Sequence, residues 1–245
     1  MRKRAFITGI AGQDGSYLSE YLISKDYEVL GLIRRNSAPE NQSSRIDHLI
    51  NQNKLNTEYG DMCDKSSLDR IIKEFQPDEI YNLAAQSHVR VSIDLPIFTV
   101  NVNSLGVINL LESFRQHAPK SKFYQASSSE MFGNNIDNDK FQRETTQMDP
   151  TSPYGCAKLF AYKFTKHYRN AYNLFISNGI LFNHESPRRG TNFVTNKVIK
   201  SAVLIHLGKL KKLELGNLDS SRDWGHSKDY TRAMNMILNH DKPDD

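Results

Sequence analysis

The sequence predicts an α/β fold, a doubly wound parallel sheet followed by a smaller C-terminal lobe. Three observations indicate this fold class. Short apolar segments rich in β-formers alternate with segments of helical periodicity, the connections between them are short, and a glycine-rich turn joins the first strand to the first helix. We expect the sheet within residues 1–182 and the second lobe within residues 183–245.

The alternation begins at the N-terminus. The run AFITGI predicts a first strand, and Tyr17, Leu18, Tyr21 and Leu22 form an apolar stripe at helical spacing in the next segment, 16–27. Similar β-rich runs predict further strands at 28–33, 55–61, 79–85, 122–128 and 174–182.

Segments of helical pattern separate these strands. Ser43 or Ser44 is the candidate N-cap of the second helix, Pro77 ends the third, and Pro96 opens the fourth. The expected helices cover residues 43–52, 65–75, 96–116 and 152–172. After about residue 183 strand and helix patterns no longer alternate regularly. We expect a helix around 194–208 and a short strand at 212–216 there.

Composition excludes several classes of protein. A net charge of +4 over 245 residues is small, and the basic runs near residues 1–4 and 209–215 are typical of solvated surface, so we expect no nucleic-acid partner. Apolar runs fall short of the roughly 20 residues of a membrane span, and the N-terminus enters a strand directly, unlike a signal peptide. Cys63 and Cys156 show no paired spacing, which favours a reducing cytoplasm.

The first turn predicts a dinucleotide site. In TGIAGQDGSYL, Gly9, Gly12 and Gly15 lie between a predicted strand and a predicted helix. Glycines at such positions allow a tight turn, a close approach of the pyrophosphate and close helix packing, while the helix N-terminus offers N–H groups to phosphate. Gln13 and Asp14 belong to the same turn. Residues 1–182 are therefore predicted to form a Rossmann domain.

The residues that follow the second predicted strand indicate which dinucleotide binds. An NAD site needs an acidic residue about 20 residues past the glycines, but Arg34 and Arg35 stand there. Paired guanidinium groups suit a 2′-phosphate, so NADP is the predicted cofactor. Asp61, followed by Met62, either holds the adenine or caps the next helix. The fourth predicted strand ends in a segment of mostly small residues, which either passes beneath the nicotinamide ribose or forms a plain turn. The candidate contacts in this segment are Leu83, Ala84, Ala85 and Ser87.

A Ser, a Tyr and a Lys form the candidate catalytic set. Tyr154 and Lys158 are four residues apart, which places them on one face of a helix. A lysine ammonium stabilises a phenolate, so this pair predicts a tyrosine base. Ser128 follows the fifth strand and is placed to hydrogen-bond the same substrate oxygen. Both Tyr154 and Lys158 are also predicted to contact the cofactor.

These motifs identify a family by resemblance. The chain resembles the extended short-chain dehydrogenase/reductases that act on nucleotide sugars and, within them, the GDP-mannose 4,6-dehydratase family. The matching segments include TGIAGQDGSYL, RIDHL, YNLAAQSHV, SSSEMFG, SPYGCAKLFAY, FNHESPRRG and RDWGHSKDY. They are spread over nearly the whole chain.

The resemblance implies a role for Glu130. Tyr154 takes the proton of the sugar 4-OH while hydride passes to NADP⁺, and Glu130 then removes the acidified C5 proton as water leaves from C6. Return of the hydride to C6 gives a 4-keto-6-deoxy sugar without net redox change, so the implied class is a hydro-lyase acting on GDP-mannose in GDP-fucose biosynthesis. Three alternatives stay open: a GDP-linked heptose as substrate; a related nucleotide-sugar epimerase or reductase, against which Glu130 argues; or a catalytically impaired NADP-binding protein, because relatives extend beyond this chain's end.

The resemblance also implies binding roles for other residues that match the family's pattern. His184 and Arg189 resemble cofactor contacts, although the residues alone favour a satisfied buried histidine at His184. The implied substrate contacts are Ser87, Ser129, Asn183, Lys197 and Arg222. We expect no metal site, because the histidines lack ligand spacing.

The chain departs from the family pattern in places. Phe98 replaces a usual tyrosine near the cofactor, and the loop after Arg35 is longer. In the family that loop reaches a neighbouring subunit, which implies a homo-oligomer, either a dimer or a tetramer. The resemblance also implies that the two lobes interleave and that the C-terminal lobe is incomplete here.

Overall fold

The structure is a computed structural model that describes residues 2–35 and 43–245. The loop after Arg35 that we expect to reach a neighbouring subunit lies largely outside the described residues.

Within these residues a six-stranded parallel sheet has the order β3-β2-β1-β4-β5-β6. This is the strand order of a doubly wound dinucleotide fold, and it confirms the predicted fold class. The strands are β1 (Arg4–Thr8), β2 (Glu28–Ile33), β3 (Asn56–Tyr59), β4 (Glu79–Asn82), β5 (Lys122–Ser128) and β6 (Phe175–Leu181). A separate parallel pair joins β7 (Asn183–Glu185) to β8 (Trp224–His226).

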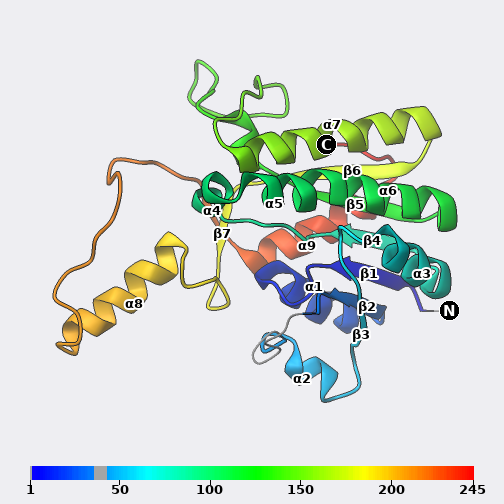
Figure 1. Cartoon of the computed structure of the whole chain (residues 1–245), viewed down its shortest axis with the longest axis horizontal. Coiled ribbons are helices and arrows are strands. Elements are labelled where there is room, and N and C mark those ends of the chain that lie inside the picture. The colour runs from blue at the N-terminus through cyan, green and yellow to red at the C-terminus, as the bar shows by residue number, and fades with distance from the viewer. Residues whose placement is uncertain (1, 36–42) are drawn as a thin grey trace.

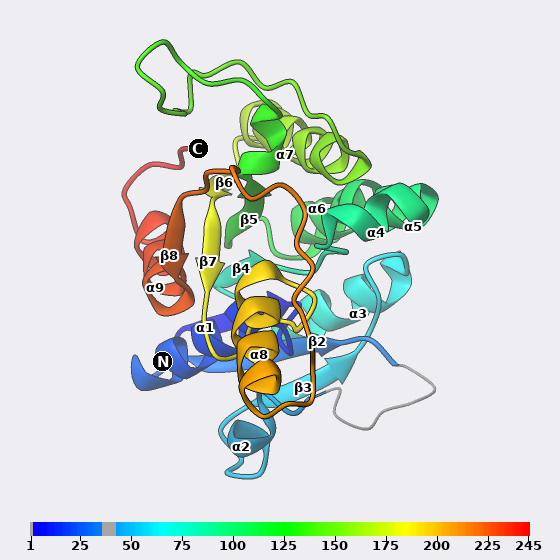
Figure 2. The same ribbon diagram turned by 90° about the vertical axis from the view of Figure 1, so that its left-hand side faces the viewer.

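Helices cover both faces of the sheet (Figures 1 and 2). The helical elements in chain order are α1 (Gln13–Ser24), α2 (Asp47–Ile50), α3 (Lys65–Phe75), α4 (Val89–Asp94), α5 (Pro96–Val100), the π-helix η1 (Asn101–Leu105), α6 (Gly106–His117), the 3₁₀-helix η2 (Ser129–Phe132), α7 (Pro153–Tyr172), α8 (Val194–His206) and α9 (Ser227–Leu238).

Two apolar cores hold these layers together. On one face, α3, α6 and α7 pack on the sheet through buried side chains such as Ile72, Phe114 and Ala161. On the other face, α1, α2 and α9 bury Leu22, Leu49 and Met234 respectively. The helix α9 therefore lies on the sheet although it follows the predicted boundary at residue 182, and the division into two lobes stays a prediction.

Two local predictions are wrong, and a third holds with a local irregularity. The helix expected at 43–52 shrinks to the four residues of α2, and its N-cap is Ile46, so neither Ser43 nor Ser44 caps it. Residues 212–216 form no strand, and β8 pairs with β7 instead. The helix expected at 96–116 is one continuous run that begins at Pro96 as predicted, with a π-helical turn in its middle.

That run also passes a test for membrane spans by length and composition, which the core helix of a globular protein can pass as well. Pro96–His117 covers 22 residues, reaches a mean hydropathy of 1.2 over its most apolar window, and is half buried inside the protein. Length and composition alone would let it cross a membrane. Here Leu110, Leu111 and Phe114 of this run are fully buried in the core against the sheet.

Candidate active site

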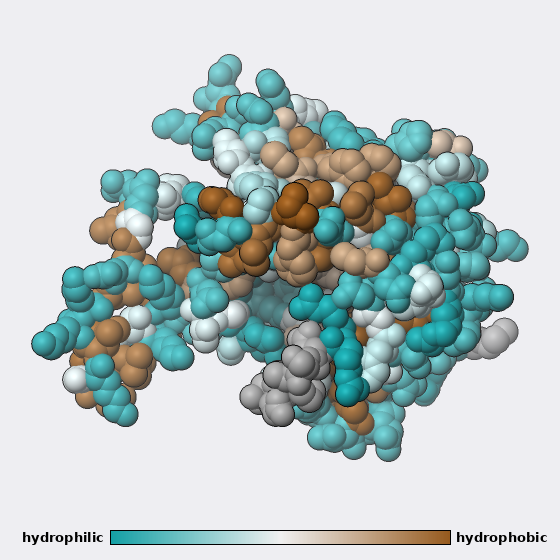
Figure 3. Space-filling view, in the orientation of Figure 1, coloured by the Kyte–Doolittle hydropathy of each residue, from teal (hydrophilic) through white to brown (hydrophobic). Residues whose placement is uncertain are grey.

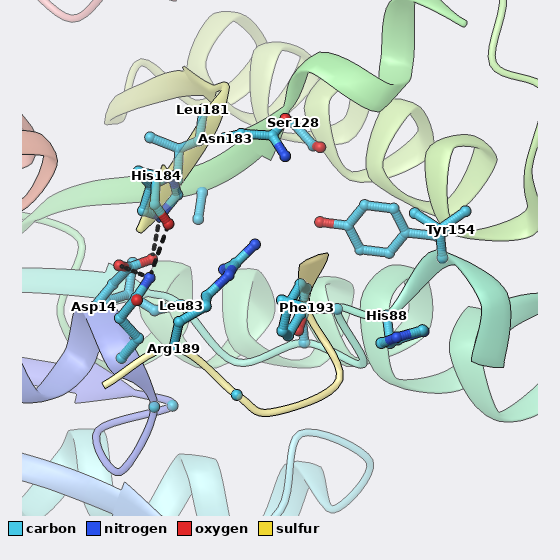
Figure 4. A pocket seen from close by; sticks show the side chains of 18 of the residues that line it. Asp14, Leu83, His88, Ser128, Tyr154, Leu181, Asn183, His184, Arg189 and Phe193 are labelled. Carbon is cyan, nitrogen blue, oxygen red and sulfur yellow. Dashed lines mark hydrogen bonds and ion pairs between the residues drawn. The ribbon is translucent and has the colours of Figure 1, made fainter. Parts of the chain in front are cut away.

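A cavity of about 650 Å³ opens at the carboxyl ends of the central strands. It is lined by the turn after β1, the segment after β4, the end of β5 and the start of α7 (Figure 4). A neighbouring hollow of about 420 Å³ shares Gly9, Gly12, Ala84 and Ala85 with it and extends past β2 and β3. The crevice at the point where strand order reverses is where doubly wound folds bind ligands.

The glycine turn has the geometry that a dinucleotide site needs. Gly9 has φ +70, and a Cβ there would lie 2.8 Å from the backbone nitrogen of Ala84. A Cβ at Gly15 would lie 2.4 Å from the carbonyl oxygen of Gly9, so the first turn of α1 could not pack against the strand. Gly12 is the N-cap of α1 and provides no side-chain cap, which leaves the helix N-terminus open to an anion.

Most of the predicted cofactor residues line these two spaces. The larger cavity contains Gly9, Gly12, Gln13, Asp14, Gly15, Leu83, Ala84, Ala85, Ser87, Tyr154, Lys158, His184 and Arg189, and the second hollow contains Arg34, Asp61 and Met62. Arg35 lines neither, and its guanidinium carbon lies 5.3 Å from the ring centroid of Tyr59. Phe98 lines the second hollow, 5.9 Å from the guanidinium carbon of Arg34.

The alternatives for Asp61 separate in the structure. The carboxylate of Asp61 accepts the backbone N–H of Cys63 at 2.8 Å. The N-cap of α3 is Asp64, whose side chain accepts the N–H of Ser66. Asp61 is therefore not the cap, and it remains available on the wall of the second hollow.

Ser128 and Glu130 lie at the junction of β5 and η2. The Ser128 hydroxyl accepts the backbone N–H of Glu130 at 3.2 Å, so Ser128 caps the 3₁₀-helix while it lines the cavity. A Cβ at Gly155 would lie 2.6 Å from the carbonyl oxygen of Glu130. The glycine at 155 thus lets α7 approach η2 closely, which brings Tyr154 next to the Ser128–Glu130 segment.

Tyr154 and Lys158 project from the first turns of α7. The Ser152 hydroxyl accepts the N–H of Gly155 at 3.0 Å and caps this helix. Burial raises the pKa of Tyr154 to about 12; a hydrogen bond with Ser128 opposes this shift, and the charge of Glu130 adds to it. The protein alone therefore holds Tyr154 as a neutral phenol at pH 7.

Lys158 is also buried, and burial lowers its pKa to about 8. Its ammonium donates to the carbonyl oxygen of Ala126 at 2.8 Å and lies 5.8 Å from the ring centroid of Tyr154. The expected lowering of the tyrosine pKa by Lys158 is not found in the protein alone: burial of the phenol raises that pKa, and the groups that lower it are Ser128 and Arg189.

His184 is held by two acceptors. Its Nδ1 lies 2.7 Å from the carbonyl oxygen of Phe182, and its Nε2 lies 2.7 Å from Asp14 Oδ2 (Figure 4). Since both partners accept, both ring nitrogens donate and the ring is an imidazolium. Burial opposes the charge, but the hydrogen bond to Asp14 and its negative charge raise the pKa of His184. The pKa of Asp14 is lowered by the same contact and by Ser227, against the effect of burial.

The predicted substrate contacts divide into two groups. Ser87, Ser129 and Asn183 line the cavity, together with the guanidinium of Arg189, which points toward its centre (Figure 4). Among the described residues, Lys197 and Arg222 line neither space. Lys197 donates to the carbonyl oxygen of Glu214 at 2.6 Å, and Arg222 donates to that of Ser221 at 2.7 Å.

Sequence reasoning missed several wall residues. Arg45, His88 and Phe193 line the larger cavity. The Nδ1 of His88 caps α4 by accepting the N–H of Val91 at 3.4 Å, and the Phe193 ring lies 3.6 Å from the guanidinium carbon of Arg189. Arg45 and His88 belong to segments that carried the family resemblance, RIDHL and YNLAAQSHV, and this was their only signal. Within the described part of the chain, no group of three His, Cys, Asp or Glu side chains could hold a metal ion.

Comparison with known proteins decides the family. The sequence profile described as GDP-mannose 4,6 dehydratase matches residues 6–245. The chain belongs to the GDP-mannose 4,6-dehydratase family. It is 50% identical to the "GDP-mannose 4,6 dehydratase" of Cricetulus griseus and to that of Homo sapiens, over 100% of this chain and 67% of each relative. The chain thus spans about two thirds of the length of these relatives.

Solved structures show the same fold. The UDP-glucose 4-epimerase of Thermus thermophilus in complex with NAD is 26% identical, with a TM-score of 0.83 over 98% of this chain and 76% of that one. The dTDP-glucose 4,6-dehydratase DesIV of Streptomyces venezuelae, with NAD and TYD bound, is 23% identical, with a TM-score of 0.85 over 98% of this chain and 73% of that one.

Proposed function

We propose that this protein is a hydro-lyase that converts GDP-mannose to GDP-4-keto-6-deoxymannose and recycles NADP in the process. The observation that carries the proposal is the meeting of Ser128, Glu130, Tyr154 and Lys158 in one cavity with the glycine turn. The relatives' printed names and the family match support the same activity.

The residues present fit a nicotinamide dinucleotide. The open N-terminus of α1 suits the pyrophosphate, and the second hollow, with Arg34 and Asp61, suits the adenosine end. The likeness to epimerase and dehydratase complexes with NAD supports this class of cofactor. The bound nicotinamide would supply the acceptor and donor of a hydride. The preference for NADP rests on Arg34 and Arg35, which follow β2 where an acidic residue would favour NAD.

The chain's own residues would divide the proton transfers. Tyr154 is placed to take the proton of the sugar 4-OH as a phenolate, which the positive charges of Lys158 and of a bound oxidised nicotinamide would stabilise, with the Ser128 hydroxyl on the same oxygen. Lys158, whose pKa of about 8 leaves it mainly protonated at pH 7, adds a positive charge near the phenol. Glu130 is placed to take the C5 proton once C4 is a ketone. The C6 hydroxyl would leave as water with the proton that Glu130 took from C5. Hydride would then return to C6 and the proton held by Tyr154 to C5, so the reaction has no net change of redox state.

The first test is a product assay. Purified protein with NADP⁺ and GDP-mannose is followed by mass spectrometry, and we expect a nucleotide sugar lighter by one water without net NADPH. Loss of water only from a GDP-linked heptose would instead identify the alternative substrate. NADPH binding without turnover of either sugar would contradict the proposal and identify an NADP-binding protein.

A Glu130→Gln variant tests the elimination step. Gln keeps the size but removes the base, so we expect loss of turnover by at least about a hundredfold with NADPH affinity unchanged. Glu144→Gln, in the polar loop that lines a different hollow behind β6, is the matched control and should keep full turnover. Normal turnover in Glu130→Gln would exclude the assigned role.

Cofactor choice is tested by binding alone. We expect wild type to bind NADPH more tightly than NADH, and Arg34→Met to remove that preference. Arg35→Met should have the smaller effect, because Arg35 lies outside the hollow. Equal affinity of the wild type for both cofactors would contradict the NADP assignment.

We also propose a homo-oligomer in a reducing cytoplasm. An apolar patch with exposed Ile97, Val100 and Leu105 crosses α5 and η1 (Figure 3), and a second copy of the chain is the partner that would cover it. Sedimentation of Ile97→Asp should show smaller particles than wild type. Cys63 and Cys156 are free and exposed, which fits a reducing compartment.

A further inference from the structure

Arg45 joins two walls of the larger cavity that are far apart in sequence. Its Nε donates to the carbonyl oxygen of Arg188 at 2.9 Å, and its Nη1 donates to the carbonyl oxygen of Ala11 at 3.2 Å. Ala11 belongs to the glycine turn after β1. Arg188 belongs to the segment between β7 and α8, directly before Arg189, whose guanidinium points into the cavity (Figure 4).

The position of Arg45 is fixed by its neighbours. Ile46 is fully buried and Leu49 nearly so, both in the core formed with α1 and α9. The turn around Arg45 closes with the N–H of Ile46 donating to the carbonyl oxygen of Ser43 at 2.7 Å. Because the next residue is anchored in the core, the guanidinium is held in place before any ligand binds, which lowers the entropy cost of binding.

A second tether connects the same two walls. The Gln13 side chain donates to the carbonyl oxygen of His184 at 3.1 Å and accepts the hydroxyl of Ser186 at 2.8 Å. Ser186 in turn accepts the backbone N–H of Arg188 at 3.0 Å. The glycine turn and the 184–189 segment are therefore held together by Arg45 and by Gln13, in addition to the ion pair between Asp14 and His184.

Among the ion pairs of the described residues, none joins Arg45 to a carboxylate. The two neighbouring arginines differ: Arg188 lies 2.5 Å from Glu20, and Arg189 lies 3.3 Å from Glu185. Arg45 lines the cavity beside Gly12, at the positive end of the α1 dipole. Its two hydrogen bonds use two of its five N–H groups, so donors remain for an anion. The carboxylate of Asp14 in the first turn of α1 is already engaged by His184 and Ser227, so a cation near this helix N-terminus is electrostatically unfavourable until an anion binds.

We propose that Arg45 is a further residue of the dinucleotide site. It clasps the glycine turn to the 184–189 segment through the carbonyls of Ala11 and Arg188, and it binds a phosphate of the dinucleotide with its remaining N–H groups. The inference rests on the proposed dinucleotide-binding function and adds to it a residue and a role.

The test measures binding of NADPH and ADP-ribose by the full chain, with no need for turnover. Arg45→Met removes both the charge and the planar set of guanidinium N–H donors. Arg45→Lys keeps the charge but cannot bridge two carbonyls. We expect Arg45→Met to weaken both ligands roughly tenfold to a hundredfold, the range for loss of a charge-assisted hydrogen bond, and Arg45→Lys to weaken them less. Binding by Arg45→Met should also depend less steeply on salt than binding by wild type.

Arg70→Lys is the matched control, because Arg70 lies on α3 in an exposed cluster with Glu58 and Glu74. Its affinities should equal those of wild type. Adenosine, which lacks phosphate, separates binding from general damage: its affinity should be unchanged in Arg45→Met.

NADPH affinities of both Arg45 variants within twofold of wild type would overturn the inference while leaving the proposed function intact. An equal loss for adenosine and NADPH would overturn the phosphate contact. Wild-type protein that binds no dinucleotide would overturn the proposed function together with the inference.

Discussion

The sheet and the helix α8 differ sharply in how they use apolar side chains. The central strands β4 and β5 bury almost every residue, and helices on both faces complete two cores. Among the described residues of α8 none is buried, and Ile199, Val203 and Leu207, the last directly after the helix, expose more than half of their surface. In Figure 1, α8 stands away from the sheet.

This difference separates the two halves of the proposed site. The glycine turn, Ser128, Tyr154 and Lys158 are attached to elements whose positions the cores determine. Lys197 lies on α8 and Arg222 lies on the exposed segment before β8, and both bind backbone carbonyls outside the cavity. The residues proposed for catalysis and cofactor binding are therefore held in place by the fold, whereas the two cations predicted to bind the substrate diphosphate lie on exposed segments.

The largest effect on stability is expected in the core between the sheet and α6. Phe114 is fully buried, and its ring centroid lies 5.4 Å from that of Phe123. Phe114→Ala should lower the free energy of unfolding by about 3–5 kcal/mol, because it removes buried area and leaves a cavity. Chemical denaturation checks this, and a loss below about 1 kcal/mol would mean that this face is far less densely packed than the structure shows.

The next effect is expected at the glycine turn. Gly15→Ala places a Cβ 2.4 Å from the Gly9 carbonyl oxygen, a contact that neither backbone segment can relieve without moving. We expect a loss of about 1–3 kcal/mol in stability, as for other overpacked positions, and a weaker affinity for NADPH. Gly216→Ala is the control, since nothing lies within 4 Å of its added Cβ. Unchanged NADPH binding in Gly15→Ala would argue against a pyrophosphate at this turn.

The Asp14–His184 pair predicts a dependence on pH. The pKa of His184 is raised in the folded protein, so its contribution is complete below the unfolded pKa of about 6.5 and is lost as pH rises through the folded pKa. The pKa of Asp14 is lowered, so its contribution is complete above its unfolded value of about 3.9 and is lost as pH falls through the folded pKa. The pair should stabilise the fold most between these two unfolded values.

Replacing His184 tests the direction of this pH dependence of stability. His184→Asn leaves the buried Asp14 without its cation and should cost about 1–3 kcal/mol near pH 6. The difference from wild type should shrink as pH rises from the unfolded pKa of about 6.5 through the folded pKa of His184. His48→Asn is the control, because His48 pairs with Glu20 at an exposed site, where ion pairs contribute little. A difference that stays constant from pH 6 to 9 would mean that the ring is neutral in the folded protein.

Sequence patterns predicted the elements whose signals are local. The bounds of β2, β5 and α3 agree with prediction residue for residue, because each is an apolar run or stripe between clear turn signals. The helix α9 and the β7–β8 pair were missed. The helix carries a local signal, the apolar stripe of Tyr230, Met234 and Leu238, whereas β7 and β8 are three residues each and are defined only by their pairing. The strand expected at 212–216 rested on the alternation of Leu213 and Leu215 with polar residues, and among the described residues it has no partner strand.

The candidate site shows the same limit. Residues that follow strand ends could be predicted, because parallel strands bring their carboxyl ends to one edge. Contacts such as Asp14 with His184 and Arg45 with Arg188 join positions 170 and 143 residues apart, and no local pattern encodes them. The close approach that Gly155 permits likewise depends on where η2 lies after folding.

The smallest effect is expected on α8, where it sharpens the opening comparison. Ile199 is 66% exposed, so Ile199→Ser removes little buried area, and the free energy of unfolding should change by less than about 0.5 kcal/mol. The measurement is the same denaturation experiment as for Phe114→Ala, performed at several protein concentrations. A loss above about 1 kcal/mol that grows with concentration would show that a second copy covers this face of α8, because only an association equilibrium makes stability depend on concentration. A similar loss independent of concentration would instead show that the face packs within one chain, and the contrast between α8 and the sheet would then fail.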